Sequence, residues 1–137
     1  MAHANEPEIL MASCLCGIVV LELTLPSKWC AHCHCTMCRK AHGAGYVTWA
    51  GFEQDQFRLA AGADQLQWFE SSTGASRGFC NQCGSSLLFR SERWPEEIHV
   101  AVGCIDGELD RRPEANVFFD THVNWMQVDS SIRVVNP

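Results

Sequence analysis

Positive charge is scarce in this sequence. Lysine and arginine together number 10, against 16 aspartates and glutamates, which gives a formal net charge of −6 at pH 7. A protein that binds nucleic acid through its surface needs a basic patch to neutralise the phosphates. We therefore expect no nucleic acid among the partners of this chain.

Long apolar runs are also lacking. A largely apolar segment over residues 9–25 is interrupted by Ser13, Glu22 and Thr24, and it is short for a membrane span. Glu6 and Glu8 precede it, where a signal peptide requires positive charge. We expect no membrane among the partners and a cytoplasmic location. The sequence leaves the oligomeric state open.

No sustained 3.6-residue periodicity, internal repeat or linker is found along the chain. Short apolar stretches rich in β-branched residues alternate with turn residues, a pattern typical of strands. The 137 residues suffice to bury the core of one domain. We predict a mainly β fold, with a flexible tail over residues 1–8 and one domain over residues 9–137. The predicted strands cover residues 18–25, 46–52, 56–59, 65–70, 87–89, 98–102 and, as the last core strand, 117–119.

Cysteine, in contrast, is abundant. Of the nine cysteines, seven fall into C-x-C or C-x-x-C clusters. An odd and clustered count favours metal binding over the disulfide framework of a secreted protein, and metal-bound thiolates suit a reducing compartment. The clusters are Cys14 with Cys16, Cys33 with Cys35 and Cys38, and Cys80 with Cys83.

The densest cluster is the C-x-C-x-x-C segment of Cys33, Cys35 and Cys38. On an extended chain Cys33 and Cys35 point to the same side, and a turn at residues 36–37 brings Cys38 over them. Three converging thiolates suit a borderline-soft tetrahedral cation such as zinc. One coordination position then stays open, as in catalytic zinc sites, unless Cys30 or His42 closes it and makes the site structural.

The knuckle Cys80-x-x-Cys83 supplies two further ligands, and Gly84 after it permits the positive φ that such turns often need. Cys14 and Cys16 are the pair available to complete its coordination. Four thiolates make a closed site that stabilises the fold and leaves no position for a substrate. We therefore expect two zinc ions per chain, one in a structural four-thiolate site and one in an open three-thiolate site.

From about Cys14 to Trp125 the chain resembles the glutathione-dependent formaldehyde-activating enzyme family, which includes centromere protein V. The motifs that carry the resemblance are Cys14-x-Cys16-Gly17, Cys33-His34-Cys35-x-x-Cys38-Arg39-Lys40-x-His42-Gly43 and Arg77-Gly78-Phe79-Cys80-x-x-Cys83-Gly84. The resemblance implies a zinc-bound β-tent of short antiparallel sheets. It also implies that Cys14, Cys16, Cys80 and Cys83 are structural ligands and that Cys33, Cys35 and Cys38 are catalytic ones. Asn116 stands where the family usually has a histidine.

Zinc held by three thiolates readily accepts a soft thiolate as its fourth ligand. We therefore interpret the chain as a zinc-dependent carbon–sulfur lyase, similar to S-hydroxymethylglutathione synthase. It would act on the adduct of glutathione or another small thiol with an aldehyde such as formaldehyde. Arg39, Lys40 and Arg77 are candidates for binding the carboxylates of glutathione. The alternative is a non-catalytic, zinc-stabilised binding module.

Overall fold

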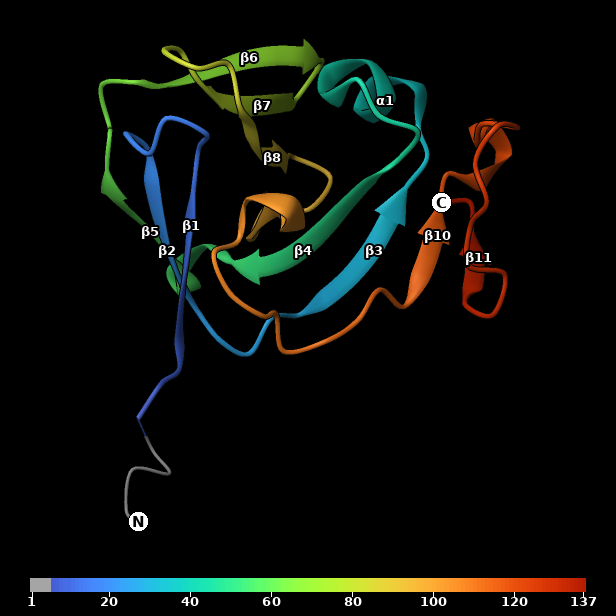
Figure 1. Ribbon diagram of the computed structural model, residues 1–137, viewed down its shortest axis with the longest axis horizontal. Helices are drawn as coiled ribbons and strands as arrows, with labels where there is room; N and C mark the ends of the chain where they lie inside the picture. The colour runs from blue at the N-terminus through green and yellow to red at the C-terminus, as the bar shows by residue number, and fades with distance from the viewer. Residues whose placement is uncertain (1–5) are drawn as a thin grey trace.

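Two β-sheets and one short α-helix make up the computed structural model, which describes residues 6–137 (Figure 1). The smaller sheet has the strand order β1-β2-β5, and the larger one has the order β11-β10-β3-β4-β9-β8-β7-β6. The strands are β1 (Ile9–Ser13), β2 (Val20–Thr24), β3 (Trp29–Cys33), β4 (Val47–Glu53), β5 (Phe57–Ala61), β6 (Leu66–Ser72), β7 (Ala75–Cys80), β8 (Ser86–Ser91), β9 (Glu97–Ala101), β10 (Ala115–Val117) and β11 (Arg133–Val135). The helices are α1 (Thr36–His42) and three 3₁₀ turns, η1 (Gln54–Gln56), η2 (Val102–Cys104) and η3 (Phe119–Thr121).

The prediction of a mainly β fold is confirmed. Pairing is antiparallel throughout both sheets except at β10, which runs parallel to β3 on one side and to β11 on the other. Parallel neighbours need a long connection between them. The connection between β10 and β11 includes η3 and the irregular segment that follows it. None of the helices in residues 6–137 is long and apolar enough to cross a membrane.

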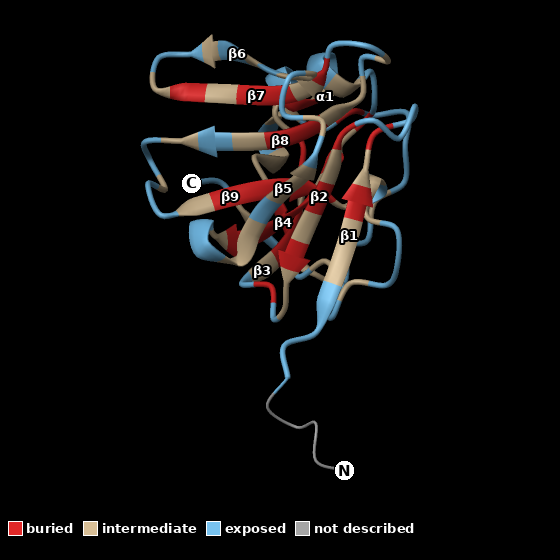
Figure 2. Cartoon of the chain, turned by 90° about the vertical axis from the view of Figure 1, so that its left-hand side faces the viewer, coloured by how far each residue is buried: buried red, intermediate tan, exposed pale blue. Residues whose placement is uncertain are grey.

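The core lies between the two sheets, which face each other (Figure 2). In β2 burial alternates with the pleat, so that Leu21 and Leu23 are fully buried whereas Glu22 is only partly covered. Leu21 and Leu23 belong to one cluster with Phe52 of β4 and Ile98 of β9. Burying each such side chain stabilises the fold by roughly 1.5–3 kcal/mol. The alternating burial along β2 therefore holds the two sheets together.

The prediction of a last core strand over residues 117–119 is wrong beyond Val117. Phe118 adopts a left-handed conformation with φ of 52°, which ends the strand. The backbone N–H of Phe119 then donates to Oδ1 of Asn136 at 2.8 Å, and the chain returns along β10 as β11. The sequence prediction also missed β1, which immediately follows the predicted tail. Residues 1–5 of that tail lie outside the described residues.

Candidate metal centres

The sulfur atoms of Cys33, Cys35 and Cys38 all lie within 4.8 Å of one another. We call them the three-thiol cluster. Cys33 is the last residue of β3, and Cys35 caps the N-terminus of α1, where its sulfur accepts a hydrogen bond from the backbone N–H of Cys38 at 3.2 Å. The predicted turn at residues 36–37 is thus the first turn of α1. The junction between strand and helix brings the three thiols together.

Hydrogen bonds inside the three-thiol cluster shift the pKa values of its thiols in opposite directions. The thiols of Cys33 and Cys38 and the backbone N–H of Cys38 stabilise a thiolate on Cys35, which holds the pKa of Cys35 far below its usual value. The same contact with Cys35 raises the pKa of Cys33, and burial adds to the effect. The geometry therefore favours a thiolate on Cys35 even without a metal. Metal binding would displace the protons of the other two thiols.

No fourth metal-binding side chain joins the three-thiol cluster within residues 6–137. Cys30 is buried in β3, but its sulfur does not belong to the cluster. The ring of His42 packs edge-on against Trp49, with centroids 5.3 Å apart. Burial, assisted by the positive charge of Arg77, lowers the pKa of His42 to about 4. Neither residue is positioned with the three sulfurs to close the site.

The histidines between these cysteines contact neighbouring strands instead. A ring nitrogen of His32 lies 2.8 Å from the hydroxyl of Thr48, and Nε2 of the buried His34 lies 2.9 Å from Oδ1 of Asn116. The side chain of Asn116 is 1% exposed and donates from Nδ2 to the carbonyl of Asp129 at 3.0 Å. The departure from the family pattern at Asn116 therefore concerns a residue that supports His34.

The sulfurs of Cys14, Cys16, Cys80 and Cys83 form a second group within 4.8 Å of one another, which we call the four-thiol cluster. Cys14 follows β1 and Cys80 ends β7, so the cluster joins the two sheets. Gly84 after the knuckle has φ of 81°, as the sequence analysis expected. A hydrogen bond with the hydroxyl of Ser85 lowers the pKa of Cys83 to about 5.

The donor sets of both clusters fit a tetrahedral thiophilic ion. Metal–sulfur distances of roughly 2.3 Å place the sulfurs of such a site about 3.8 Å apart. In the four-thiol cluster the sulfur of Cys16 lies 3.6 Å from that of Cys14 and 3.8 Å from that of Cys80. The four-thiol cluster could complete the coordination of one ion. The three-thiol cluster could hold a second ion with one position left over.

A cavity of about 920 Å³ borders the three-thiol cluster. All three cysteines line it, and so do Ala115 and Val117 of β10. Asn116, between these two residues, does not line the cavity, because successive side chains of a strand point to opposite faces. No residue of the four-thiol cluster lines it either. Of the two clusters, the three-thiol cluster is therefore the one that lines this cavity.

Arg77 of β7 is the candidate substrate-binding residue that the structure brings to this cavity. Its side chain is 8% exposed, its Nη1 lies 3.5 Å from the sulfur of Cys38, and its guanidinium lies 5.0 Å from the centre of the Phe89 ring. Its Nε is buried without a hydrogen-bond partner. Arg39 donates to the carbonyl of Thr121 at 2.9 Å, and neither it nor Lys40 lines the cavity.

Other residues of the cavity wall carry no short-range sequence signal. The aromatic residues come from separate strands and loops, and the sequence analysis proposed no site role for any of them. Glu97 and His99 occupy alternate positions of β9 and both reach the cavity. The period-two pattern of this segment predicted the strand but not its function. The lining includes Trp29, Trp49, Phe89, Trp94, Glu97, His99 and Phe118.

The chain is similar to known proteins over most of its length. The sequence model of the glutathione-dependent formaldehyde-activating enzyme family matches residues 9–121. A Halomonas elongata protein described as "Putative glutathione-dependent formaldehyde-activating enzyme" is 29% identical over 130 residues, which cover 89% of this chain and 82% of that protein. The crystal structure of a Rhodobacter sphaeroides protein, a structural-genomics target, aligns with a TM-score of 0.62 at 28% identity. That alignment covers 74% of this chain and 92% of the other.

Proposed function

The chain belongs to the glutathione-dependent formaldehyde-activating enzyme family, and we propose that it is a zinc-dependent carbon–sulfur lyase. Its substrate is the adduct of glutathione, or of another small thiol, with an aldehyde such as formaldehyde. The observation that carries this proposal is the three-thiol cluster, which has no fourth ligand among residues 6–137 and lines a cavity of about 920 Å³. A binding module stabilised by metal would need only the four-thiol cluster.

We assign zinc to both clusters. Cys33, Cys35 and Cys38 would hold one ion and leave it a coordination position for a soft thiolate, where the pKa of an entering thiol would be lowered. The closed four-thiol cluster has no such position and stabilises the contact between the sheets. These two roles, one in binding the substrate thiol and one in stabilising the fold, explain why one chain carries two groups of cysteines.

Arg77 provides the positive charge beside the three-thiol cluster. A metal dication with three thiolates has a net charge of about −1, and a substrate thiolate adds another negative charge. The buried guanidinium 3.5 Å from the sulfur of Cys38 offsets this charge. Its unpartnered Nε leaves a donor for a substrate carboxylate. We propose Arg77 as the main contact for glutathione, with Arg39 and Lys40 acting at longer range from outside the cavity lining.

The reaction needs no further reactant. In the forward direction the substrate sulfur attacks the carbonyl carbon, a C–S bond forms, and the π bond of the carbonyl breaks. The proton that the thiol loses ends on the hydroxyl oxygen of the adduct. The reverse direction breaks the C–S bond and returns the proton to sulfur. Because all nine cysteines are free thiols, we propose that this chemistry takes place in the cytoplasm.

Cobalt substitution tests the proposed thiol site. Each sulfur bound to cobalt adds to the thiolate-to-metal charge-transfer band, so titration of glutathione should intensify this band. S-methylglutathione, which has no ionisable thiol, should leave the band unchanged. The Cys35→Ser variant serves as the control and should lose the response. If glutathione leaves the band of the wild-type protein unchanged, the fourth position does not accept a thiol and the proposed function is wrong.

A further inference from the structure

One part of the cavity wall consists of rings packed around a histidine. The ring centroid of His99 lies 4.7 Å from that of Trp29, in an edge-on contact, 5.5 Å from that of Trp94 and 5.7 Å from that of Phe89. All four residues line the cavity. We call them the aromatic end. They come from β3, β8, β9 and the turn before β9.

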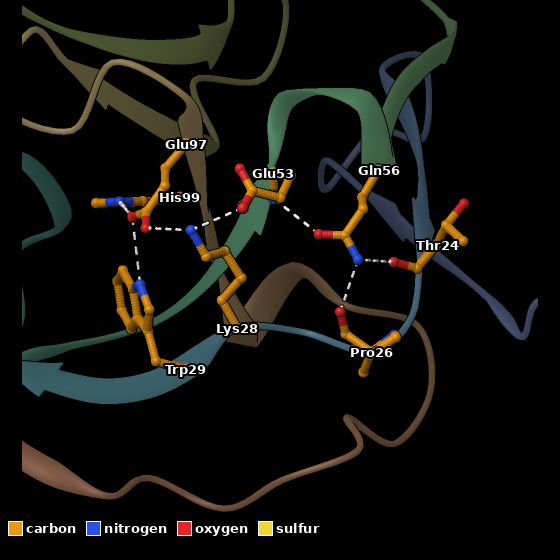
Figure 3. Close-up of polar contacts among 8 residues, drawn as sticks. All are labelled: Thr24, Pro26, Lys28, Trp29, Glu53, Gln56, Glu97 and His99. Atoms are coloured by element: carbon orange, nitrogen blue, oxygen red, sulfur yellow. Dashed lines mark hydrogen bonds and ion pairs between the residues drawn. The ribbon is translucent and has the colours of Figure 1, made fainter.

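The aromatic end is held in place by Glu97 (Figure 3). Oε1 of Glu97 accepts hydrogen bonds from Nε1 of Trp29 at 3.3 Å and from Nε2 of His99 at 2.9 Å, while Oε2 accepts from Nζ of Lys28 at 2.8 Å. The Trp29 ring also lies directly against Gly51 of β4, where a Cβ atom would come within 2.3 Å of it. A wall that is fixed before binding costs little ordering entropy when a ligand arrives.

The aromatic end offers little to an anion. The charge of Glu97 is balanced by Lys28 through their ion pair. Burial lowers the pKa of His99 despite the hydrogen bond to Glu97, which disfavours a positive charge on its ring. The guanidinium of Arg93 lies 5.1 Å from the Trp94 ring, but Arg93 is an exposed residue whose charge is screened by solvent. An uncharged apolar group therefore matches this wall better than the carboxylates of glutathione do.

The aromatic end and the three-thiol cluster belong to the same cavity and are joined through two side chains. The guanidinium of Arg77 lies against Phe89 on one side and reaches the sulfur of Cys38 on the other. A substrate whose sulfur lies at the cluster can therefore extend past Phe89. The adduct of formaldehyde has only a hydroxymethyl group on that sulfur. A cavity of about 920 Å³ is large enough for a much bulkier ligand.

We propose that the aromatic end binds the carbon substituent of the aldehyde, so that the preferred substrate is the thiol adduct of an aromatic or other bulky apolar aldehyde. This inference rests on the proposed function and specifies its substrate class. The bonds are those already given: the sulfur adds to the carbonyl carbon and the proton of the thiol ends on oxygen. The two aldehydes differ only in the group on the carbonyl carbon: formaldehyde has hydrogen there, and the proposed aldehyde has an apolar substituent.

Two glutathione thioethers provide a matched pair of probes for the zinc-loaded protein. S-benzylglutathione places a phenyl ring on the carbon next to sulfur, and S-methylglutathione places only hydrogens there. Isothermal titration calorimetry should show S-benzylglutathione binding at least about tenfold more tightly, because its ring is buried against the aromatic end. Equal affinities would overturn the inference. If glutathione still intensified the cobalt band, the proposed function would stand. If glutathione and both thioethers failed to bind, both proposals would fall.

Variants of Trp94 test whether the preference for S-benzylglutathione comes from the aromatic end. Trp94→Ala should reduce the advantage of S-benzylglutathione to about threefold or less, whereas Trp94→Phe should retain most of it. Trp125→Ala is the control, because Trp125 is 68% exposed and does not line the cavity. Thermal denaturation checks that each variant is folded, and Phe89→Leu serves as a second wall variant. A preference that survives both Trp94→Ala and Phe89→Leu would overturn the inference.

Discussion

Nη1 of Arg77 lies 3.5 Å from the sulfur of Cys38, although 39 positions separate the two residues in the chain. The contact places a buried positive charge against the three-thiol cluster. The guanidinium has an aromatic neighbour in Phe89, and its buried Nε has no hydrogen-bond partner. A buried cation with an unpartnered donor is suited to holding an anionic ligand.

Arg77→Gln should therefore weaken glutathione binding. A buried hydrogen bond to a charged group contributes about 1.5–3 kcal/mol, which corresponds to a loss of affinity of about 10- to 100-fold. Calorimetric titration of the zinc-loaded protein measures the change. Arg58→Gln, which removes an exposed ion pair with Glu22, should bind glutathione like the wild type. Equal affinity in Arg77→Gln and Arg58→Gln would contradict the role of Arg77.

Zinc content should be two ions per chain, one tightly bound and one labile. A closed four-thiolate site resists a chelator better than a site with an open position. Metal analysis during titration with a chelator should show two separate steps. Cys30→Ser should retain both ions, since Cys30 lies outside both clusters. A preparation that holds one zinc after reconstitution under reducing conditions would rule out the two-site arrangement.

Cys83→Ser and Cys35→Ser should differ in their effect on folding. The four-thiol cluster links the two sheets, so loss of Cys83 should destabilise the fold by roughly several kcal/mol through lost metal binding. Cys35→Ser should keep the fold and lose thiol binding. Circular dichroism melting curves compare the two, with Cys104→Ser as the control for removing a thiol outside both clusters. If the Cys83 and Cys35 variants melt at the same temperature, the structural and catalytic assignments are not distinct.

Asn116→Leu should reduce stability rather than activity per folded molecule. The change removes the partner of Nε2 of the buried His34, whose Nδ1 already lacks one. Leaving a buried polar atom unpaired costs about 1–3 kcal/mol. Urea unfolding measures the loss, and Asn81→Leu at an exposed site is the control. A variant of Asn116 with unchanged stability and lost turnover would show instead that this position acts in the reaction.

Acid should weaken the fold through Glu97. Burial alone raises the pKa of Glu97, but hydrogen bonds from Lys28, His99 and Trp29 outweigh burial and hold the pKa below its usual value. The stability from this group is therefore complete above the unfolded-state pKa of about 4.3 and is lost as pH falls through the lower folded-state pKa. Urea unfolding between pH 6 and pH 3 should show a shallower decline for Glu97→Gln than for the wild type. The exposed control Glu108→Gln should follow the wild type, and identical slopes for all three proteins would contradict the prediction.

The strands that could be predicted from the sequence are those marked by a local apolar, β-branched stretch or by local alternation; β2 is of the first kind, and its Leu21 and Leu23 are buried on either side of Glu22. β7 was missed because Arg77 and Gly78 interrupt any apolar pattern, and the burial of Arg77 depends on a cavity built by distant strands. β11 has three residues and depends on its parallel pairing with β10. Such pairing has no local signature.

The cysteine clusters could be predicted because their spacing is local. Arg39 and Lys40 were chosen for their place beside Cys38, but α1 turns by about 100° per residue, so successive side chains leave the face that carries the cysteine. The aromatic end could not be predicted, since Trp29 and His99 meet only through the pairing of β3, β4 and β9. Sequence spacing therefore predicted the cysteine clusters and missed the aromatic end of the cavity.

Within β3, Trp29, Ala31 and Cys33 occupy alternate positions and line the cavity, as Cys30 also does, whereas His32 contacts Thr48 on the neighbouring strand. The side chains that alternate along β3 therefore serve two faces, one toward the cavity and one toward the neighbouring strand. A substitution in β3 alters one of these faces at one point. A deletion or insertion of a single residue would exchange the two faces along the affected part of the strand, so that His32 would face the cavity and Cys33 would turn away from it. The length of β3 is therefore more tightly constrained than its amino-acid composition.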